Sequence, residues 1–351
     1  MKTIRLLGLA ALAAIVLFTG CPTESDDDSG GGTPSINIGK VNDGDGKAGV
    51  WECEVLSNGR IVLTVYKNVT INGDFVTDEW VVIDIQNNAI VTWNANLSNA
   101  TTGGSDLVYL TGNGRFSVAG GNMNVKSSDS YAIYCTSTTV EIEISGGTLL
   151  ATGDSSRVIF NNGSVTVNGG NMEINKNGGI AIQSNGNVTV NKGTITAKGV
   201  AGTAVWAGNV TVNGGTITAS GVDGWGIFAS GDITVNKGNV SVSKKDGIAI
   251  YSEANVVIKG GTITASDKDS TAVSADVDIL ITGSITLEGF IMATNVDVRA
   301  GGTLIVAAGK ELYIYGDLVN NGTINNNGDI YYYGTFVNNG SGTGLEKIYQ
   351  L

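Results

Sequence analysis

The segment Val210-Thr-Val-Asn-Gly-Gly-Thr-Ile-Thr-Ala219 decides the fold, because close variants of it recur along the chain. Its first apolar residue has counterparts at intervals of about 23 residues, at Phe116, Ile142, Val165, Val188, Val210, Ile233, Val256 and Ile279. A fixed period of this length is the signature of a repeat architecture, in which each unit packs only against its neighbours. The sequence therefore predicts a stack of similar coils rather than several independent globular domains.

Each unit contains three short runs in which apolar and polar residues alternate, as they do in β-strands. In the unit that begins at Val210 the runs are 210–212, 216–219 and 226–228. Equivalent apolar residues would stack as columns inside a tube with three sides, such as Val167, Val190, Val212, Val235 and Ile258, or Ile195, Ile217, Val240 and Ile263. The predicted fold is all-β: a three-sided parallel β-helix, or β-solenoid, with about 23 residues per coil. The crossover preference of parallel strands makes it right-handed.

Asparagine also recurs at the turn that follows the first run of each unit, at Asn168, Asn191, Asn213 and Asn236. A side-chain amide carries both donors and an acceptor. We therefore expect these amides to form hydrogen bonds from coil to coil.

The two flanks of the regular repeat, which covers 116–295, are less uniform. Residues 36–115 are expected to form an N-terminal cap and irregular coils. In 296–351, glycine recurs every six residues, at Gly316, Gly322, Gly328, Gly334 and Gly340. The segment 313–322 also resembles 331–340, eighteen residues later. Three segments of six residues make one coil of 18 residues, so we expect narrower coils and a cap at this end.

The N-terminus has the features of an exported lipoprotein. Lys2 and Arg5 precede an apolar run over 6–18, which is too short to span a membrane and is typical of a signal peptide over 1–20. The segment 17–21 resembles a bacterial lipobox, which implies lipidation of Cys21. The rest of 21–35 lacks an apolar run and is acidic, so we expect a flexible tether. The expected location is the outer membrane or cell surface, held by the lipid alone.

Composition excludes several classes of function. The net charge is −12, which disfavours a nucleic-acid partner. The chain contains no histidine, so catalytic triads that need this residue and histidine-ligated zinc are excluded. We find no catalytic residues in the sequence and do not expect an enzyme. The oligomeric state does not follow from the sequence.

The third run of each unit is the most informative about function. Its inward column is expected to be Ile133, Ile159, Ile182, Val205, Ile227, Ile250 and Val273. The residue after each would point outward, and five of these seven are aromatic: Tyr134, Phe160, Trp206, Phe228 and Tyr251. We expect small residues such as Ala132 and Ala204 to be the other outward neighbours. An exposed apolar stripe of this kind usually marks a binding site, although aromatic packing between coils is the alternative interpretation.

Acidic residues gather in the loop before the third run, at Asp154, Asp223, Asp246, Asp267 and Asp269. Carboxylates from adjacent coils are ligands that calcium prefers, and Asp223, Asp246 and Asp269 are the candidates. A pair of carboxylates could also hydrolyse glycosidic bonds. Turn aspartates are, however, common for local conformational reasons.

The units 208–219 and 245–250 resemble the repeats of bacterial carbohydrate-binding β-helix proteins, which belong to the pectate-lyase-like superfamily. The resemblance implies non-catalytic binding of polysaccharide at a cell surface, in some cases with calcium. The expected function is therefore polysaccharide binding along the aromatic stripe. The alternatives are an adhesin or structural surface protein with a protein partner, and a polysaccharide lyase or hydrolase.

Overall fold

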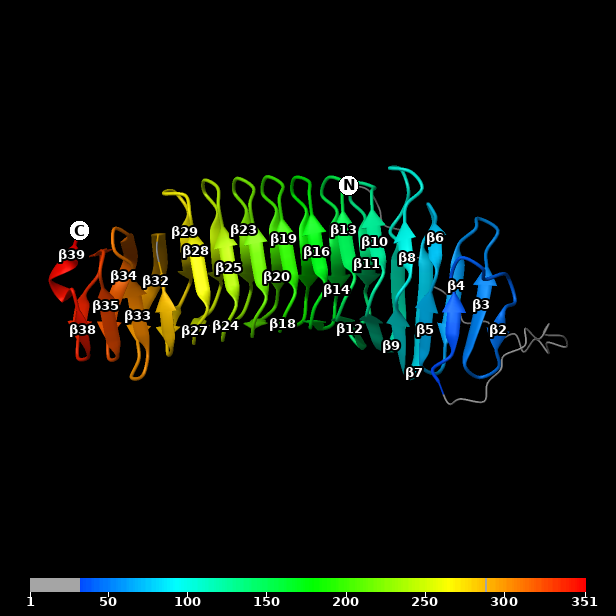
Figure 1. Ribbon diagram of the computed structural model, residues 1–351, viewed down its shortest axis with the longest axis horizontal. Coiled ribbons are helices and arrows are strands. Elements are labelled where there is room, and N and C mark those ends of the chain that lie inside the picture. The colour runs from blue at the N-terminus through cyan, green and yellow to red at the C-terminus, as the bar shows by residue number, and fades with distance from the viewer. Residues whose placement is uncertain (1–31, 288) are drawn as a thin grey trace, which may run out of the picture. The chain divides into compact units, whose positions relative to one another are not determined.

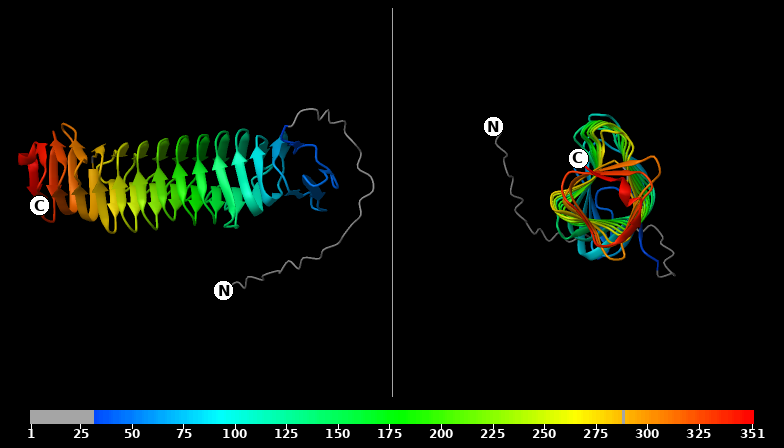
Figure 2. Two further views of the ribbon diagram at one scale, coloured as in Figure 1. Left: turned by 90° about the horizontal axis from the view of Figure 1, so that it is seen from below. Right: turned by 90° about the vertical axis from the view of Figure 1, so that its left-hand side faces the viewer.

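The computed structural model describes residues 32–287 and 289–351. Within the unit formed by residues 33–351, the chain is a parallel β-solenoid of about 12 turns with about 23 residues per turn, which confirms the predicted fold class. The successive coils form a row, and viewed along the axis they superimpose as a tube (Figures 1 and 2). The predicted signal peptide and the predicted lipidation of Cys21 lie outside the described residues, as does most of the predicted tether.

Each coil contributes one strand to each of three faces. The first face contains β1 (Ser35–Asn37), β5 (Val69–Asn72), β12 (Val140–Ile144), β15 (Val165–Val167), β18 (Val188–Val190), β21 (Val210–Val212), β24 (Ile233–Val235), β27 (Val256–Ile258), β30 (Asp278–Ile281) and β37 (Phe336–Asn338). The second face contains β6 (Asp74–Val76), β8 (Asn96–Ser98), β10 (Asn122–Val125), β13 (Thr148–Ala151), β16 (Asn171–Ile174), β19 (Thr194–Ala197), β22 (Thr216–Ala219), β25 (Asn239–Val242), β28 (Thr262–Ala265), β31 (Ser284–Thr286), β33 (Thr303–Val306), β35 (Thr323–Asn326) and β38 (Ser341–Thr343).

The third face carries the candidate site. It contains β4 (Ile61–Val65), β11 (Tyr131–Cys135), β14 (Arg157–Asn161), β17 (Ile180–Ser184), β20 (Thr203–Ala207), β23 (Trp225–Ala229), β26 (Ile248–Ser252), β29 (Thr271–Ala275), β36 (Asp329–Tyr332) and β39 (Ile348–Gln350). Four longer strands run from the third face into the first: β7 (Val81–Trp93), β9 (Val108–Val118), β32 (Gly289–Val298) and β34 (Glu311–Asn320). The remaining elements are β2 (Gly46–Lys47), β3 (Trp51–Val55) and the short 3₁₀ helix η1 (Leu345–Lys347).

The core consists of the predicted apolar columns. On the first face Val190 pairs with Val167 on one side and Val212 on the other, and on the second face Ile195 pairs with Ile217. These side chains have no exposed surface. Full burial of a valine or isoleucine stabilises a fold by about 1.5–3 kcal/mol. Since each column continues from coil to coil, no coil has to bury its apolar face alone.

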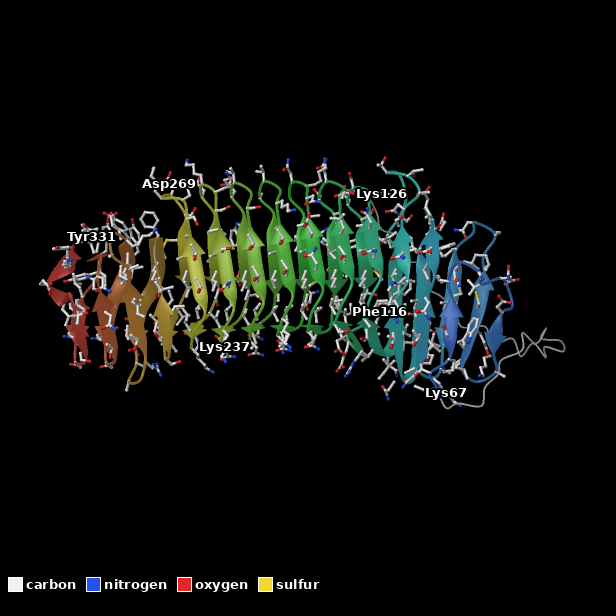
Figure 3. The ribbon with its side chains drawn as sticks, viewed as in Figure 1. Lys67, Phe116, Lys126, Lys237, Asp269 and Tyr331 are labelled. Atoms are coloured by element: carbon white, nitrogen blue, oxygen red, sulfur yellow. The ribbon has the colours of Figure 1, made fainter. Side chains whose placement is uncertain are left out.

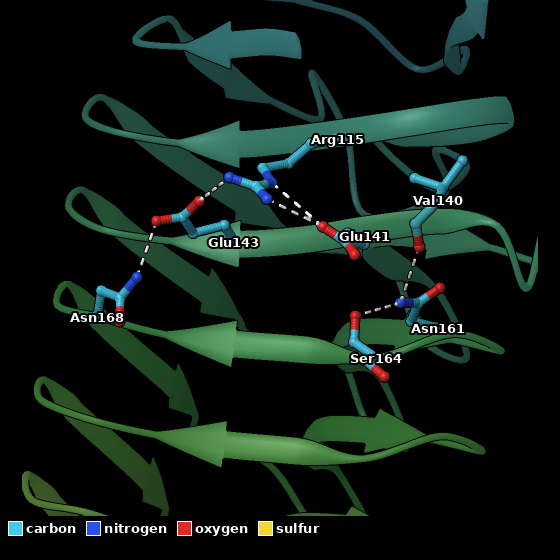
Figure 4. Close-up of polar contacts among 7 residues, drawn as sticks. All are labelled: Arg115, Val140, Glu141, Glu143, Asn161, Ser164 and Asn168. Carbon is cyan, nitrogen blue, oxygen red and sulfur yellow. Dashed lines mark hydrogen bonds and ion pairs between the residues drawn. The ribbon is translucent and has the colours of Figure 1, made fainter. Parts of the chain in front are cut away.

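The asparagine column forms a continuous ladder, as predicted. The Nδ2 of Asn191 donates to Oδ1 of Asn168 at 2.8 Å, and Asn213 and Asn236 repeat this bond at 2.8 and 2.6 Å. Asn168 in turn donates to Oε1 of Glu143 at 2.8 Å, and the carboxylate of Glu143 pairs with Arg115 at 3.3 Å (Figure 4). All donors point the same way, toward an anion at the end of the ladder. Aligned hydrogen bonds of this kind strengthen one another.

The two ends of the solenoid differ from its centre. At the N-terminal end β2, β3 and β4 are antiparallel. Parallel pairing begins where β4 meets β7 on the third face and where β1 meets β5 on the first. At the C-terminal end Glu311 pairs with Asp329, and Leu318 pairs with Phe336, which confirms the expected turn of 18 residues. Glycine is required at these tighter corners because a Cβ at Gly316 would collide with the backbone of the preceding coil.

No helix in residues 32–287 or 289–351 has the length and apolar character needed to cross a membrane.

Candidate binding surface

The five predicted aromatic residues lie in one outward column on the third face, which we call the first column. Strand pairing places Tyr134 beside Phe160, Trp206 beside Phe228, and Phe228 beside Tyr251. Gln183 stands between Phe160 and Trp206, and Ser274 follows Tyr251. The inward column beneath them, from Ile133 to Val273, is completely buried as expected.

The expected outward neighbours of these rings were assigned wrongly from the sequence. Ala132, Ala181, Ala204, Ala249 and Ala272 have no exposed surface, so two consecutive residues point inward in the third-face strands of the regular coils. Strict alternation fails at this point of the strand. The second outward position is therefore one residue earlier than predicted. It forms a second column, which contains Tyr131, Arg157, Ile180, Thr203, Trp225, Ile248 and Thr271.

Both columns extend beyond the range that the sequence suggested. Tyr109 precedes Tyr134 in the first column, and Met292, Tyr315 and Tyr333 follow Ser274. The second column continues through Phe290, Tyr313, Tyr331 and Tyr349. Sequence reasoning missed these residues because the spacing there departs from the regular repeat, to 25 residues between Tyr109 and Tyr134 and to 18 between Tyr313 and Tyr331. The similarity between 313–322 and 331–340 was the signal that could have connected them to the stripe.

The rings gather into three clusters. The N-terminal cluster is Trp80, Tyr109, Tyr131, Tyr134 and Phe160; the central cluster is Trp206, Trp225, Phe228 and Tyr251; the C-terminal cluster is Phe290, Tyr313, Tyr315, Tyr331, Tyr333 and Tyr349. Tyr331 is labelled in Figure 3 toward the C-terminal end. Neighbouring rings have centroids 4.6 to 5.9 Å apart. Contacts of this kind add about 0.5–1.5 kcal/mol per pair beyond simple burial.

Exposure differs from ring to ring within the clusters. Phe228 contacts Trp206, Trp225 and Tyr251, and it is half-buried. Trp206 contacts the Phe228 ring alone among described aromatic residues, since Gln183 occupies the coil on its other side, and it remains 41% exposed. Tyr315 and Tyr333 are 42% and 51% exposed. The columns thus contribute to stability and also present aromatic surface to solvent.

Two arginines stand over rings of the N-terminal cluster. The guanidinium carbon of Arg60 lies 5.1 Å from the Trp80 ring centroid, and Arg60 pairs with Glu79 at 3.3 Å. Arg157 lies 5.4 Å from the Tyr131 ring, and its Nε donates to Oε1 of Gln183 at 2.5 Å. These cation–π contacts place the guanidinium groups over the rings and stabilise both side chains.

Carboxylates border the rings of the other two clusters. The hydroxyl of Tyr251 donates to both oxygens of Asp276 at 3.1 and 3.2 Å, and the hydroxyl of Tyr313 donates to Glu311 at 2.9 Å. Desolvation, followed by the bond to Asp276, raises the pKa of Tyr251. The bond to Glu311 raises the pKa of Tyr313. These phenols therefore remain neutral donors at physiological pH.

The aspartates considered for calcium lie in turns. Asp223 and Asp246 adopt positive φ angles of 55° and 58°, a conformation that aspartate tolerates better than most residues. Asp246 pairs with Lys245 at 3.4 Å, and Asp269 pairs with Lys268 at 2.8 Å on a loop at the edge of the solenoid (Figure 3). Within the described part of the chain, no three acidic or cysteine side chains come together as metal ligands would. The loop conformation gives these aspartates a structural explanation.

No family model, curated protein or solved structure matches this chain.

Proposed function

We propose that this protein is a lipid-anchored surface protein that binds a polysaccharide, or another extended polymer, along the first and second columns without catalysis. The observation that carries the proposal is the alignment, on one face, of two outward columns rich in aromatic residues, of which Trp206, Tyr315 and Tyr333 are 41%, 42% and 51% exposed. A large apolar patch on an otherwise polar surface usually marks a site of interaction.

The periodicity of the columns suits an extended polymer. Coils of a parallel solenoid rise about 4.8 Å each, which is close to the length of one sugar unit in an extended polysaccharide. A chain lying along the solenoid axis would therefore meet a similar aromatic surface at each unit. Sugars offer apolar C–H surfaces for the rings and hydroxyl groups for Tyr251, Tyr313 and the polar residues beside them.

Trp206 is the residue on which we expect binding to depend most. Its indole is the most exposed ring of the central cluster, and Gln183 leaves its face toward the preceding coil without an aromatic neighbour. Phe228, by contrast, is surrounded by three rings and supports the others. A ligand can thus stack on Trp206 without displacing an existing ring contact.

Binding to a panel of polysaccharides by pull-down or affinity electrophoresis tests the proposal. We expect Trp206→Ala to reduce binding of the recognised polysaccharide at least tenfold. Tyr66→Ala, a matched aromatic control whose hydroxyl contacts Glu52 of the N-terminal hairpin, should bind normally. Unchanged binding in Trp206→Ala would remove the columns from the proposal.

The lipid anchor has its own test. Substitution of Cys21 by serine should release the protein from the membrane fraction and abolish incorporation of labelled fatty acid. Retention of both properties would contradict anchoring through Cys21.

A protein partner is the second candidate, and the composition of the N-terminal cluster favours it. Tyrosine, tryptophan and arginine are enriched at the centres of protein interfaces, and Arg157 over Tyr131 combines two of them. Loss of target-cell binding after protease treatment, but not after glycosidase treatment, would support an adhesin. A lyase or hydrolase would instead release products from an acidic polysaccharide and lose this activity in Asp246→Ala.

A further inference from the structure

A third outward column borders the aromatic rings, and we call it the polar margin. Its members stand two residues after each member of the first column: Thr136, Asn162, Asn185, Gly208, Ser230, Glu253 and Asp276. Most of these residues are exposed. Asn185 donates to Asn162 at 2.7 Å, so the margin is continuous from coil to coil at this point. It contains no basic residue and becomes acidic beside the central cluster.

The two acidic members of the margin lie next to Tyr251. Asp276 accepts the hydroxyl hydrogen bond of Tyr251, while Glu253 is close enough to act on this phenol electrostatically. Neither carboxylate belongs to an ion pair among the described residues. Each carboxylate oxygen can accept more than one hydrogen bond, so both side chains keep capacity for donors from a ligand.

The opposite border of the central cluster does not compensate this negative charge. The loops before β26 and β29 carry equal numbers of lysines and aspartates: Lys244, Lys245, Lys268, Asp246, Asp267 and Asp269. Lys245 pairs with Asp246, and Lys268 pairs with Asp269. Arg157 belongs to the N-terminal cluster, where Gln183 and the Tyr131 ring engage its guanidinium. The central cluster is therefore an apolar surface with an acidic edge.

We propose that the central cluster selects an uncharged polysaccharide, whose hydroxyl groups donate to Glu253 and Asp276, and that these carboxylates exclude polyuronates. The inference rests on the proposed function. A neutral sugar supplies the donors that a carboxylate needs. A uronate would bring further negative charge to the same edge, where the exposed carboxylates of Glu253 and Asp276 repel it over a Debye length of about 10 Å at 0.1 M salt.

Titration of the full chain with two soluble probes tests the inference: a neutral β-glucan and polygalacturonate, each at low and high salt. We expect the β-glucan to bind at least tenfold more tightly at low salt, and added salt to reduce this ratio. The double substitution Glu253→Gln and Asp276→Asn should increase polygalacturonate binding at least threefold at low salt and leave it unchanged at high salt.

The matched control is the double substitution Glu141→Gln and Asp297→Asn, which changes the net charge equally on the first face. This control should leave the preference for the β-glucan over polygalacturonate unchanged. If it increased polygalacturonate binding as much as the margin variant does, the preference would be due to net charge alone and the inference would be overturned. Tighter binding of polygalacturonate by the unmodified protein would also overturn it, while the proposed function would stand. Binding of neither probe, nor of any polysaccharide in the panel, would remove the proposed function and this inference together.

Discussion

Interruption of the asparagine ladder should destabilise the solenoid most when the break is in the middle. Asn191 makes two ladder bonds, one to Asn168 and one from Asn213, whereas Asn236 makes one, to Asn213. The net contribution of a hydrogen bond is about 0.5–1.5 kcal/mol. Asn191→Ala should therefore reduce the free energy of unfolding by about 1–3 kcal/mol, and Asn236→Ala by about half as much.

Water can replace part of the lost hydrogen bonding and so reduces the loss of stability, because the ladder lies at a corner of the tube where its amides are only partly buried. A solenoid also opens coil by coil, so a single midpoint of global unfolding does not measure one corner. Amide hydrogen exchange is the suitable assay. The bonds from the backbone amide of Asn191 to Val167 and of Asn213 to Val190 should lose protection in Asn191→Ala, while those of the C-terminal coils should not.

Equal losses of protection in Asn191→Ala and Asn236→Ala would refute this reasoning. Such a result would mean that asparagine acts through the conformational preference of its own turn and not through bonds between coils. A substitution that preserves the amide, Asn191→Gln, would not separate the two effects, because its longer side chain changes the bond geometry.

Three further predictions follow from the burial of individual groups. Phe228→Ala should destabilise the central coils by about 2–4 kcal/mol, because Phe228 has three ring partners. Trp206→Ala should reduce stability less than Phe228→Ala does, and should reduce polysaccharide binding more. A larger stability loss in Trp206→Ala than in Phe228→Ala, measured by denaturant titration, would contradict this prediction. Burial raises the pKa of Asp106 from its ordinary value of 3.8 to about 6, so folding favours its protonated form. Stability should fall as pH rises from about 4 to about 6, and Asp106→Asn should remove this slope and raise stability at pH 7 by at most about 3 kcal/mol; an unaltered slope would exclude Asp106 as its source. Burial also raises the pKa of the Cys53 and Cys135 thiols to about 11, so both should resist alkylation at pH 8 until the chain is denatured, and rapid labelling of the native protein would disprove their burial.

The sequence was sufficient to predict the fold because, in a solenoid, the spacing of equivalent residues along the chain equals the length of one coil. Val167, Val190 and Val212 stand one coil apart in sequence and in space, so a single period identifies both the strands and the columns they form. The same argument located the asparagine ladder and the 18-residue turn near the C-terminus.

The candidate surface was predicted only in part, for a local reason. Alternation of inward and outward residues fails at Ala132 and its equivalents, where two neighbours both face the core. A period-two pattern therefore assigns Tyr131 and Trp225 to the wrong side and hides the second column. The N-terminal coils were predicted only as irregular, because β7 and β9 run without a break through the corner between the third and first faces, where the regular units have two separate strands.

The regular spacing of the two columns has a consequence for how a polymer would move on them. A ligand whose repeat is close to the coil rise has several equivalent registers, and each adds to the statistical weight of the bound state. Such a ligand could shift by one coil by exchanging one ring for the next, without leaving the surface. Gln183 and Ser274 interrupt the rings between clusters, so this one-dimensional diffusion would be confined to a single cluster. A longer polymer would contact several clusters at once and would be held in place by them.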